Sequence, residues 1–182
     1  MQRIITRATS LILVLVAIAL AGASPAHALG QKQFVTHDKT SGAVALVQEG
    51  RAATLYVDPA DHAGVIRAAG DLSADIERVS AARATLAKDV QPAGGDVVII
   101  GTVGKSTLID SLIAAGTLDV SALRGKWEGW LVQSVVRPLP GVERALVIAG
   151  SDKRGTIYGI YELSEQIGVS PWYWWADVPV NR

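Results

Sequence analysis

Two apolar runs near the carboxyl end of the 182-residue chain restrict its fold more than any other feature. WLVQSVV, residues 130–136, and RALVIAG, residues 144–150, are rich in β-branched residues and flank the loop PLPGVE. A short loop that contains proline and glycine is typical of a β-hairpin. The two runs are therefore predicted to form neighbouring antiparallel strands.

Further strands and three helices are expected around this hairpin. Asp58 and Pro59 are interpreted as the N-cap and first residue of a helix, because proline has no amide to leave unpaired there. The apolar residues of that helix recur at spacings of four and three, as a buried helix face requires. The strands are predicted at VALVQEG (44–50), ATLYVDP (53–59) and DVVIIGT (96–102), and the helix stripe contains Val65, Ala69, Leu72, Ile76 and Val79.

The other two helices are predicted from residue 106 to about 115 and from 153 to 166. Gly168 and Pro171 should end the second of them. Its inner side is predicted to carry Ile157, Ile160, Tyr161, Ser164 and Ile167. The expected fold class is α+β, with a mixed and mainly antiparallel sheet of four to six strands on which the helices pack.

The first 28 residues have the pattern of a secretory signal peptide. Arg3 and Arg7 precede an apolar run from 11 to 21, and Ala26-His27-Ala28 is a small-x-small cleavage site. The alternative is a membrane anchor, although the run is shorter than the ~20 residues that a spanning helix needs. We expect a mature domain of residues 29–182 in the periplasm or outside the cell, and the absence of cysteine excludes a lipoprotein anchor and disulfides.

Composition argues against several classes of partner. The chain has 17 basic and 17 acidic residues, and loss of Arg3 and Arg7 would leave 15 against 17. No basic patch for nucleic acid is evident, and no stable membrane association is expected. The two remaining histidines, His37 and His62, are far apart in the sequence and no thiol is present, so neither a metal nor a cofactor is predicted.

Two glycine-containing turns could bind an anion. IIGTVGKST (99–107) resembles a phosphate-binding loop, but Ile99 stands where that loop requires glycine, so nucleotide binding is rejected. AGSDKRGTIYGIYELSEQIG (149–168) places Lys153, Arg154 and Thr156 at a helix start, where a sugar carboxylate could bind. We favour a capped helix whose Arg154 pairs with a neighbouring domain.

Carboxylates and aromatic rings are the remaining candidates. Glu162 and Glu165 are three residues apart on one helix, so they are expected to be solvated rather than to face each other across a cleft. Four adjacent rings close the chain, and they could form a sugar-stacking platform or pack against another protein surface. These rings are Trp172, Tyr173, Trp174 and Trp175.

The stretch from 127 to 180 resembles glycoside hydrolase family 115, the xylan α-1,2-glucuronidases. GSDKRGTIYGIYELSEQIG and SPWYWWADVPV are its most specific segments, whereas the resemblance upstream is looser. It implies an amino-terminal α/β domain similar to the small domain that precedes the barrel in hexosaminidases and glucuronidases. The aromatic run would then lead into a (β/α)8 barrel with the acid, the base and the uronate-binding residues.

The resemblance implies a non-catalytic domain of an exported xylan α-1,2-glucuronidase. The complete enzyme would hydrolyse (4-O-methyl)glucuronic acid side chains from glucuronoxylan, and its barrel would be the partner of this domain. No catalytic residue can be assigned, because the chain has no position that matches the family's catalytic ones. The alternatives are a stand-alone carbohydrate-binding module, with exposed coplanar tryptophans, and a structural module, with the rings buried against protein.

Overall fold

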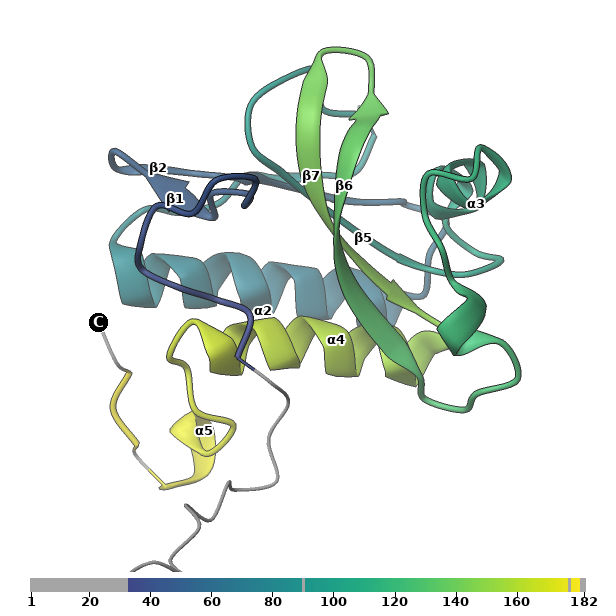
Figure 1. Ribbon diagram of the computed structural model, residues 1–182. Coiled ribbons are helices and arrows are strands. Elements are labelled where there is room, and N and C mark those ends of the chain that lie inside the picture. Colours follow the sequence, from purple (N-terminus) through teal and green to yellow (C-terminus); the bar gives the residue numbers. More distant parts are fainter. Residues whose placement is uncertain (1–32, 90, 177, 181–182) are drawn as a thin grey trace, which may run out of the picture. The chain divides into compact units, whose positions relative to one another are not determined.

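A five-stranded sheet organises the unit formed by residues 34–182 in the computed structural model (Figure 1). The structure describes residues 33–89, 91–176 and 178–180, and the predicted signal peptide lies outside them. The strand order is β4-β3-β5-β7-β6. The strands are β3 (Thr54–Val57), β4 (Leu86–Ala87), β5 (Val97–Thr102), β6 (Trp130–Leu139) and β7 (Val142–Gly150).

The sheet is mixed but mostly parallel, so the prediction of a mainly antiparallel sheet was wrong. Strands β4, β3, β5 and β7 pair in parallel, and β6 alone runs antiparallel to its neighbour, β7. The hairpin of β6 and β7 is confirmed, with Val132 opposite Ile148. A hairpin reveals its orientation in the local sequence, whereas parallel neighbours are joined by long crossovers whose return path is not visible there.

A small antiparallel pair precedes the main sheet. β1 (Val47–Gln48) and β2 (Arg51–Ala52) are joined through Glu49 and Gly50, both at positive φ. The region 44–59, predicted to contain two strands, therefore contains three. The turn lies one residue earlier than expected, and β3 is a separate strand of the large sheet rather than the second arm of the hairpin.

The three main helices cover the sheet on both faces. Helices α2 (Ala63–Ser80) and α4 (Lys153–Gln166) lie side by side on one face, and α3 (Thr107–Ala114) lies on the other (Figure 1). A 3₁₀ turn (Ser121–Leu123) and the short helix α5 (Tyr173–Ala176) complete the elements. No helix among the described residues has the length and apolar character needed to span a membrane.

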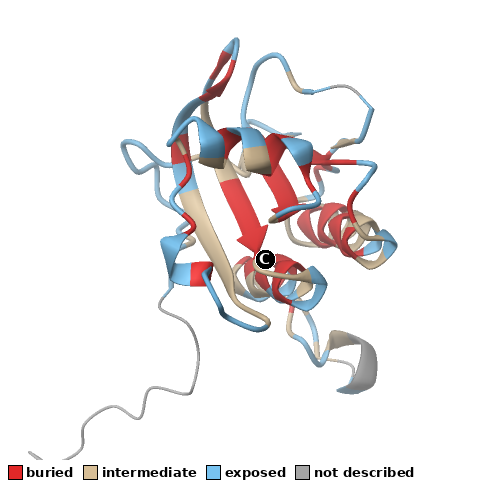
Figure 2. Cartoon of the chain, turned by 90° about the vertical axis from the view of Figure 1, so that its right-hand side faces the viewer, coloured by how far each residue is buried: buried red, intermediate tan, exposed pale blue. Residues whose placement is uncertain are grey.

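Two apolar clusters hold these layers together. In β5, Val98 and Ile100 face α2 and α4, whereas Val97 and Ile99 face α3. Alternate residues of a strand point to opposite faces, so a strand covered on both sides must be apolar throughout. All six residues of β5 are buried, and Figure 2 shows the buried residues gathered on the strands and on the facing sides of the helices.

The structure corrects two details of the helices. α2 begins at Ala63 with His62 as its N-cap, so Asp58 is not its cap and Pro59 is not its first residue. Tyr161 is exposed at the rim of α4, where its hydroxyl donates to Asp71 at 2.9 Å, rather than lying on the buried side. The bounds of α4 and its buried Ile160, Ser164 and Ile167 match the prediction.

Candidate functional site

A buried polar network lies where the parallel strands end. Asp61 accepts from the amide of Thr102 at 2.7 Å and from its hydroxyl at 2.9 Å. The Thr102 hydroxyl also lies 2.8 Å from that of Thr156, which donates to the carbonyl of Asp152 at 3.0 Å. Asp61, Thr102 and Thr156 are buried, so these bonds supply the partners that buried polar groups need. The network joins the segment before α2, the end of β5 and the start of α4.

Asp58 makes a second connection at the same edge. Its carboxylate accepts from the amide of Thr107, the first residue of α3, at 2.8 Å, from the Thr107 hydroxyl at 2.5 Å and from the amide of Ala60 at 2.9 Å. Burial raises the pKa of Asp58, but the hydrogen bonds from Thr107 and Ala60 outweigh it and hold that pKa below its ordinary value of 3.8. Asp58 thus binds the first residue of α3 across the sheet edge and does not cap α2.

Asp152 is the N-cap of α4. One carboxylate oxygen accepts from the amide of Gly155 at 2.8 Å, and the other accepts from the amide of Glu128 at 2.7 Å. These two amides lower the pKa of Asp152 below its ordinary value of 3.8. The carboxylate therefore fixes the loop before β6 onto the start of α4.

The backbone amides that could bind an anion at these turns already donate to aspartate carboxylates. The amides of Thr102, Gly104, Thr107 and Gly155 all donate to aspartate side chains of this chain. One of the two cations of the second turn is also paired, since the Arg154 guanidinium lies 2.9 Å from the Glu128 carboxylate, and Lys153 is exposed. The capped-helix interpretation of this turn is supported, and Arg154 has one partner, Glu128, within this unit. Its pairing with a neighbouring domain stays a prediction.

Glycine is required in both turns for reasons of space. A Cβ on Gly101 would lie 2.5 Å from the Cβ of Ser106, and a Cβ on Gly150 would lie 2.2 Å from the amide nitrogen of Thr156. Ser106 caps α3 by accepting from the amide of Ile109 at 3.4 Å. The glycines that resembled a phosphate loop therefore let α3 and α4 start close to the strands.

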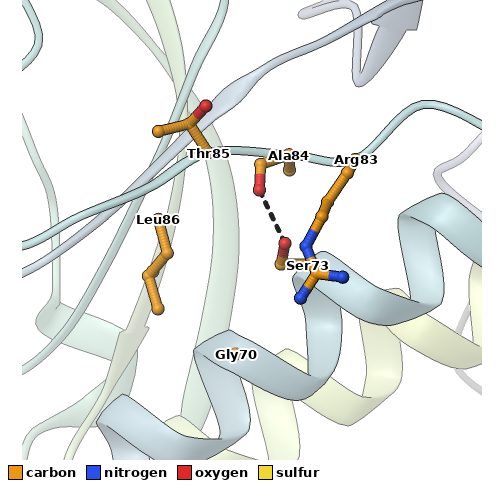
Figure 3. A pocket seen from close by; sticks show the side chains of 6 residues that line it. All are labelled: Gly70, Ser73, Arg83, Ala84, Thr85 and Leu86. Atoms are coloured by element: carbon orange, nitrogen blue, oxygen red, sulfur yellow. Dashed lines mark hydrogen bonds between the residues drawn. The ribbon is translucent and has the colours of Figure 1, made fainter.

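The two glutamates considered from the sequence both lie on α4 and do not face each other across a groove. Glu162 accepts from the side chain of Gln166 at 3.0 Å, and Glu165 is exposed on the same helix. A shallow groove of about 470 Å³ between α2 and the β4 edge is drawn in Figure 3. Its lining carries one charged side chain, Arg83, and no carboxylate, so it lacks the acid and base of a glycosidase. Nor does any described group of three His, Cys, Asp or Glu residues form a metal-binding cluster.

The terminal aromatic run is placed in part. Trp172 is 64% exposed, and the ring of Tyr173 lies 5.3 Å from the guanidinium of Arg78 at the end of α2. The side chains of Trp174 and Trp175 lie outside the described set. Exposure of Trp172 fits both a sugar platform and an interface with a further protein surface.

One aromatic position escaped the sequence analysis. Trp127 is 90% exposed in the loop that Glu128 ties to α4. On α4 the guanidinium of Arg154 donates to the hydroxyl of Tyr158 at 2.9 Å. The spacing of four between Arg154 and Tyr158 was a usable signal for that contact, because residues at i and i+4 are neighbours on a helix. The ion pair between Glu128, next to Trp127, and Arg154 joins two different elements, so no local sequence pattern indicated it.

Together these features define an α+β domain whose polar groups mainly serve its own architecture. Comparison with solved structures then gives its family. The chain matches a family GH115 4-O-methyl-alpha-glucuronidase with specificity for decorated arabinogalactans, at 33% identity and a TM-score of 0.59. The match covers 75% of this chain and 16% of that one. The chain belongs to glycoside hydrolase family 115 as one domain of it.

The other two comparisons add no further relative. No protein-family model matches the chain, and the search of curated proteins gave no significant match. The solved glucuronidase is therefore the basis for the function proposed below, and the chain spans only about a sixth of its length.

Proposed function

We propose that this chain is a non-catalytic accessory domain of an exported α-glucuronidase. The observation that carries the proposal is the match over 75% of the chain to 16% of a family GH115 enzyme. The polar network of the described residues is consistent with it, because each aspartate of that network is committed to capping a helix or joining strand ends. In this proposal the acid and the base belong to a further part of the enzyme.

The reaction proposed for the complete enzyme is hydrolysis of (4-O-methyl)glucuronic acid side chains from a plant polysaccharide. Two polysaccharides are candidate substrates, glucuronoxylan and decorated arabinogalactan. The resemblance of residues 127–180 to xylan α-1,2-glucuronidases favours glucuronoxylan, whereas the solved relative is specific for decorated arabinogalactans. We propose glucuronoxylan as the substrate and make arabinogalactan the competing result of the test.

The test uses the protein extended through the coding sequence that follows Arg182. Uronic acid release is measured from glucuronoxylan and from glucuronic-acid-decorated arabinogalactan under the same conditions. Faster release from xylan supports the proposed substrate, and faster release from arabinogalactan replaces it. Release from neither would contradict the assignment as a glucuronidase domain.

Export is a second part of the proposal. It is based on Arg3, Arg7 and the cleavage site Ala26-His27-Ala28 after the apolar run. The mature protein is expected to begin at Leu29 and to reach the periplasm or the medium. Mass spectrometry of the cell fractions checks this, and a cytoplasmic protein that retains Met1 to Ala28 would contradict it.

A carbohydrate-binding role is the second candidate function. The exposed rings of Trp127 and Trp172 favour it, since an aromatic face can stack on the C–H face of a sugar. Titration of the 182-residue chain with xylan oligosaccharides, followed by tryptophan fluorescence, tests it. Saturable quenching that Trp127→Ala or Trp172→Ala abolishes would support sugar binding, and a flat titration would reject it.

A further inference from the structure

Asp75, near the end of α2, is a buried carboxylate that the network at the sheet edge does not use. It is 5% exposed. The other two buried aspartates of the described residues, Asp58 and Asp61, accept from backbone amides and threonine hydroxyls. Asp75 instead pairs with a side-chain cation, the guanidinium of Arg78. A buried carboxylate is costly unless it is paired, so Asp75 holds the Arg78 side chain in place.

Arg78 extends from this ion pair to the aromatic segment that follows α4. Its guanidinium lies 5.3 Å from the centre of the Tyr173 ring. A cation within about 6 Å of an aromatic face is attracted to it, and the attraction is stronger where water is partly excluded. The Arg78 side chain is only partly exposed. It therefore connects the buried Asp75 on α2 with the ring of Tyr173 on α5.

Helix α5 depends on tertiary contacts for its position. It has four residues, and isolated helices shorter than about 12 residues are marginal in water. The amide of Tyr173 donates to the carbonyl of Ser170, and the amide of Ala176 donates to the carbonyl of Trp172, both at 2.9 Å. These bonds are local to residues 170–176 and do not attach the helix to the sheet or to α2. The contact between Tyr173 and Arg78 provides such an attachment.

Val169 is a second point of attachment for the same segment. Its side chain is buried, and its amide donates to the carbonyl of Ser164 on α4 at 2.9 Å. Trp172 lies between Val169 and Tyr173 in the chain and is 64% exposed. Its amide donates to the Ser170 hydroxyl at 3.1 Å, which includes it in the same turn.

The two attachments determine which ring of the segment faces solvent. Consecutive residues of a helix do not point in the same direction. When the ring of Tyr173 lies against Arg78, the ring of the preceding residue, Trp172, is turned away from α2. This agrees with the exposure of Trp172 and the partial burial of Tyr173.

We propose that Asp75 and Arg78 form a clamp that holds the segment 170–176 on the end of α2 and keeps the Trp172 ring outward. Both are positioning residues, because they act on Trp172 through Tyr173. The two apolar clusters of the domain contain none of these side chains. Opening the clamp should therefore release α5 while the sheet and the main helices stay folded.

Amide hydrogen exchange of the 182-residue chain, measured by NMR, tests the clamp. The amides of Tyr173 and Ala176 report on α5, since their bonds form it. Arg78→Ala and Asp75→Asn should each speed exchange at these two amides about threefold to tenfold, as expected for loss of a cation–π contact. The amides of Val98 and Leu163, in the buried core, should exchange as in the wild type.

Two further variants separate the clamp from a general effect of charge. Arg78→Lys keeps the cation and should retain most of the protection at Tyr173 and Ala176. Arg83→Ala is the matched control, because it removes an ion pair with Glu77 at the same end of α2 and leaves Arg78 in place. It should change neither amide.

Tyr173→Leu tests the same contact from the other side. It removes the aromatic face but keeps an apolar side chain, so the ring-current shift of the Arg78 side-chain protons should disappear. Exchange at Ala176 should rise as it does in Arg78→Ala. Residues that act through one contact have non-additive effects, so combining the two substitutions should cause little further increase.

Three results would overturn the clamp. Unchanged exchange in Arg78→Ala and Tyr173→Leu would show that Val169 and the local bonds position α5 without it. Additive effects of the two substitutions would show that the residues act separately. Faster exchange throughout the chain in Asp75→Asn would assign Asp75 to the stability of the whole fold. These measurements need neither a sugar nor the remainder of the enzyme, so failure of the clamp leaves the proposed function unaffected.

Discussion

Asp61 and Thr102, 41 residues apart in the chain, are joined by two hydrogen bonds at the buried end of β5. One runs from the backbone amide of Thr102 and the other from its hydroxyl, at 2.7 and 2.9 Å. Asp61 is 6% exposed, so these bonds are shielded from solvent. This pair holds the start of α2 against the sheet edge on which α4 also begins.

Asp61→Ala should therefore destabilise the domain strongly. It leaves the buried amide of Thr102 without an acceptor, at an expected cost of about 2 to 3 kcal/mol in the free energy of unfolding. Urea denaturation measures this, and Asp38→Ala, at an exposed carboxylate, should change stability by less than about 0.5 kcal/mol. Equal effects of the two substitutions would show that the Asp61 network does not stabilise the fold.

Acid should weaken the domain through Asp58 and Asp152. Hydrogen bonds hold the pKa of each in the folded state below its ordinary value of 3.8. A depressed folded pKa contributes stability that is present above the unfolded pKa and is lost as the pH falls through the folded pKa. The urea midpoint should thus be steady near neutral pH and fall as the pH drops below about 4.

Thr107→Ala tests the cause of this acid sensitivity. It removes the hydroxyl that donates to Asp58, so the pKa of Asp58 should move up toward 3.8 and its share of the acid dependence should shrink. NMR titration of the Asp58 carboxyl carbon in both proteins reads this directly. An unchanged titration would mean that the hydroxyl does not lower the Asp58 pKa.

Two glycines should respond in opposite directions to the same substitution. Gly150→Ala would place a Cβ 2.2 Å from the amide nitrogen of Thr156, so α4 must shift, at a cost of about 1 to 3 kcal/mol or more. Gly70→Ala puts a Cβ into open space within α2 and should stabilise the helix by about 0.5 to 1 kcal/mol. Thermal unfolding of both variants checks the signs, and destabilisation by both would contradict the packing described for Gly70.

Local patterns predicted the elements better than their arrangement. The bounds of α4 and the β6–β7 hairpin followed from a stop signal at Gly168 and a proline-glycine loop, which act between near neighbours. Sheet direction was misjudged because the parallel pairing of β3, β5 and β7 depends on long crossovers. Asp58 was misassigned for a related reason, since its partner Thr107 lies 49 residues away.

In the candidate site too, local features were predictable from the sequence and tertiary contacts were not. The turns before α3 and α4 were recognised from glycine, serine and basic residues, and the caps Ser106 and Asp152 act on residues three positions away. The sequence did not reveal that aspartates from other segments occupy the remaining amides, nor that Trp127 stands exposed beside α4. Those facts depend on tertiary contacts between elements that no local pattern specifies.

If the acid and the base belong to a further part of the enzyme, as proposed, the 182-residue chain should not release uronic acid. Glycoside hydrolysis needs two carboxyl groups about 5 to 10 Å apart across a sugar-sized pocket. The groove between α2 and the β4 edge carries no carboxylate. The purified chain should release no glucuronic acid from glucuronoxylan or decorated arabinogalactan above a buffer blank. Turnover by the short chain, lost when its own carboxylates are substituted, would show that it carries the acid and the base itself.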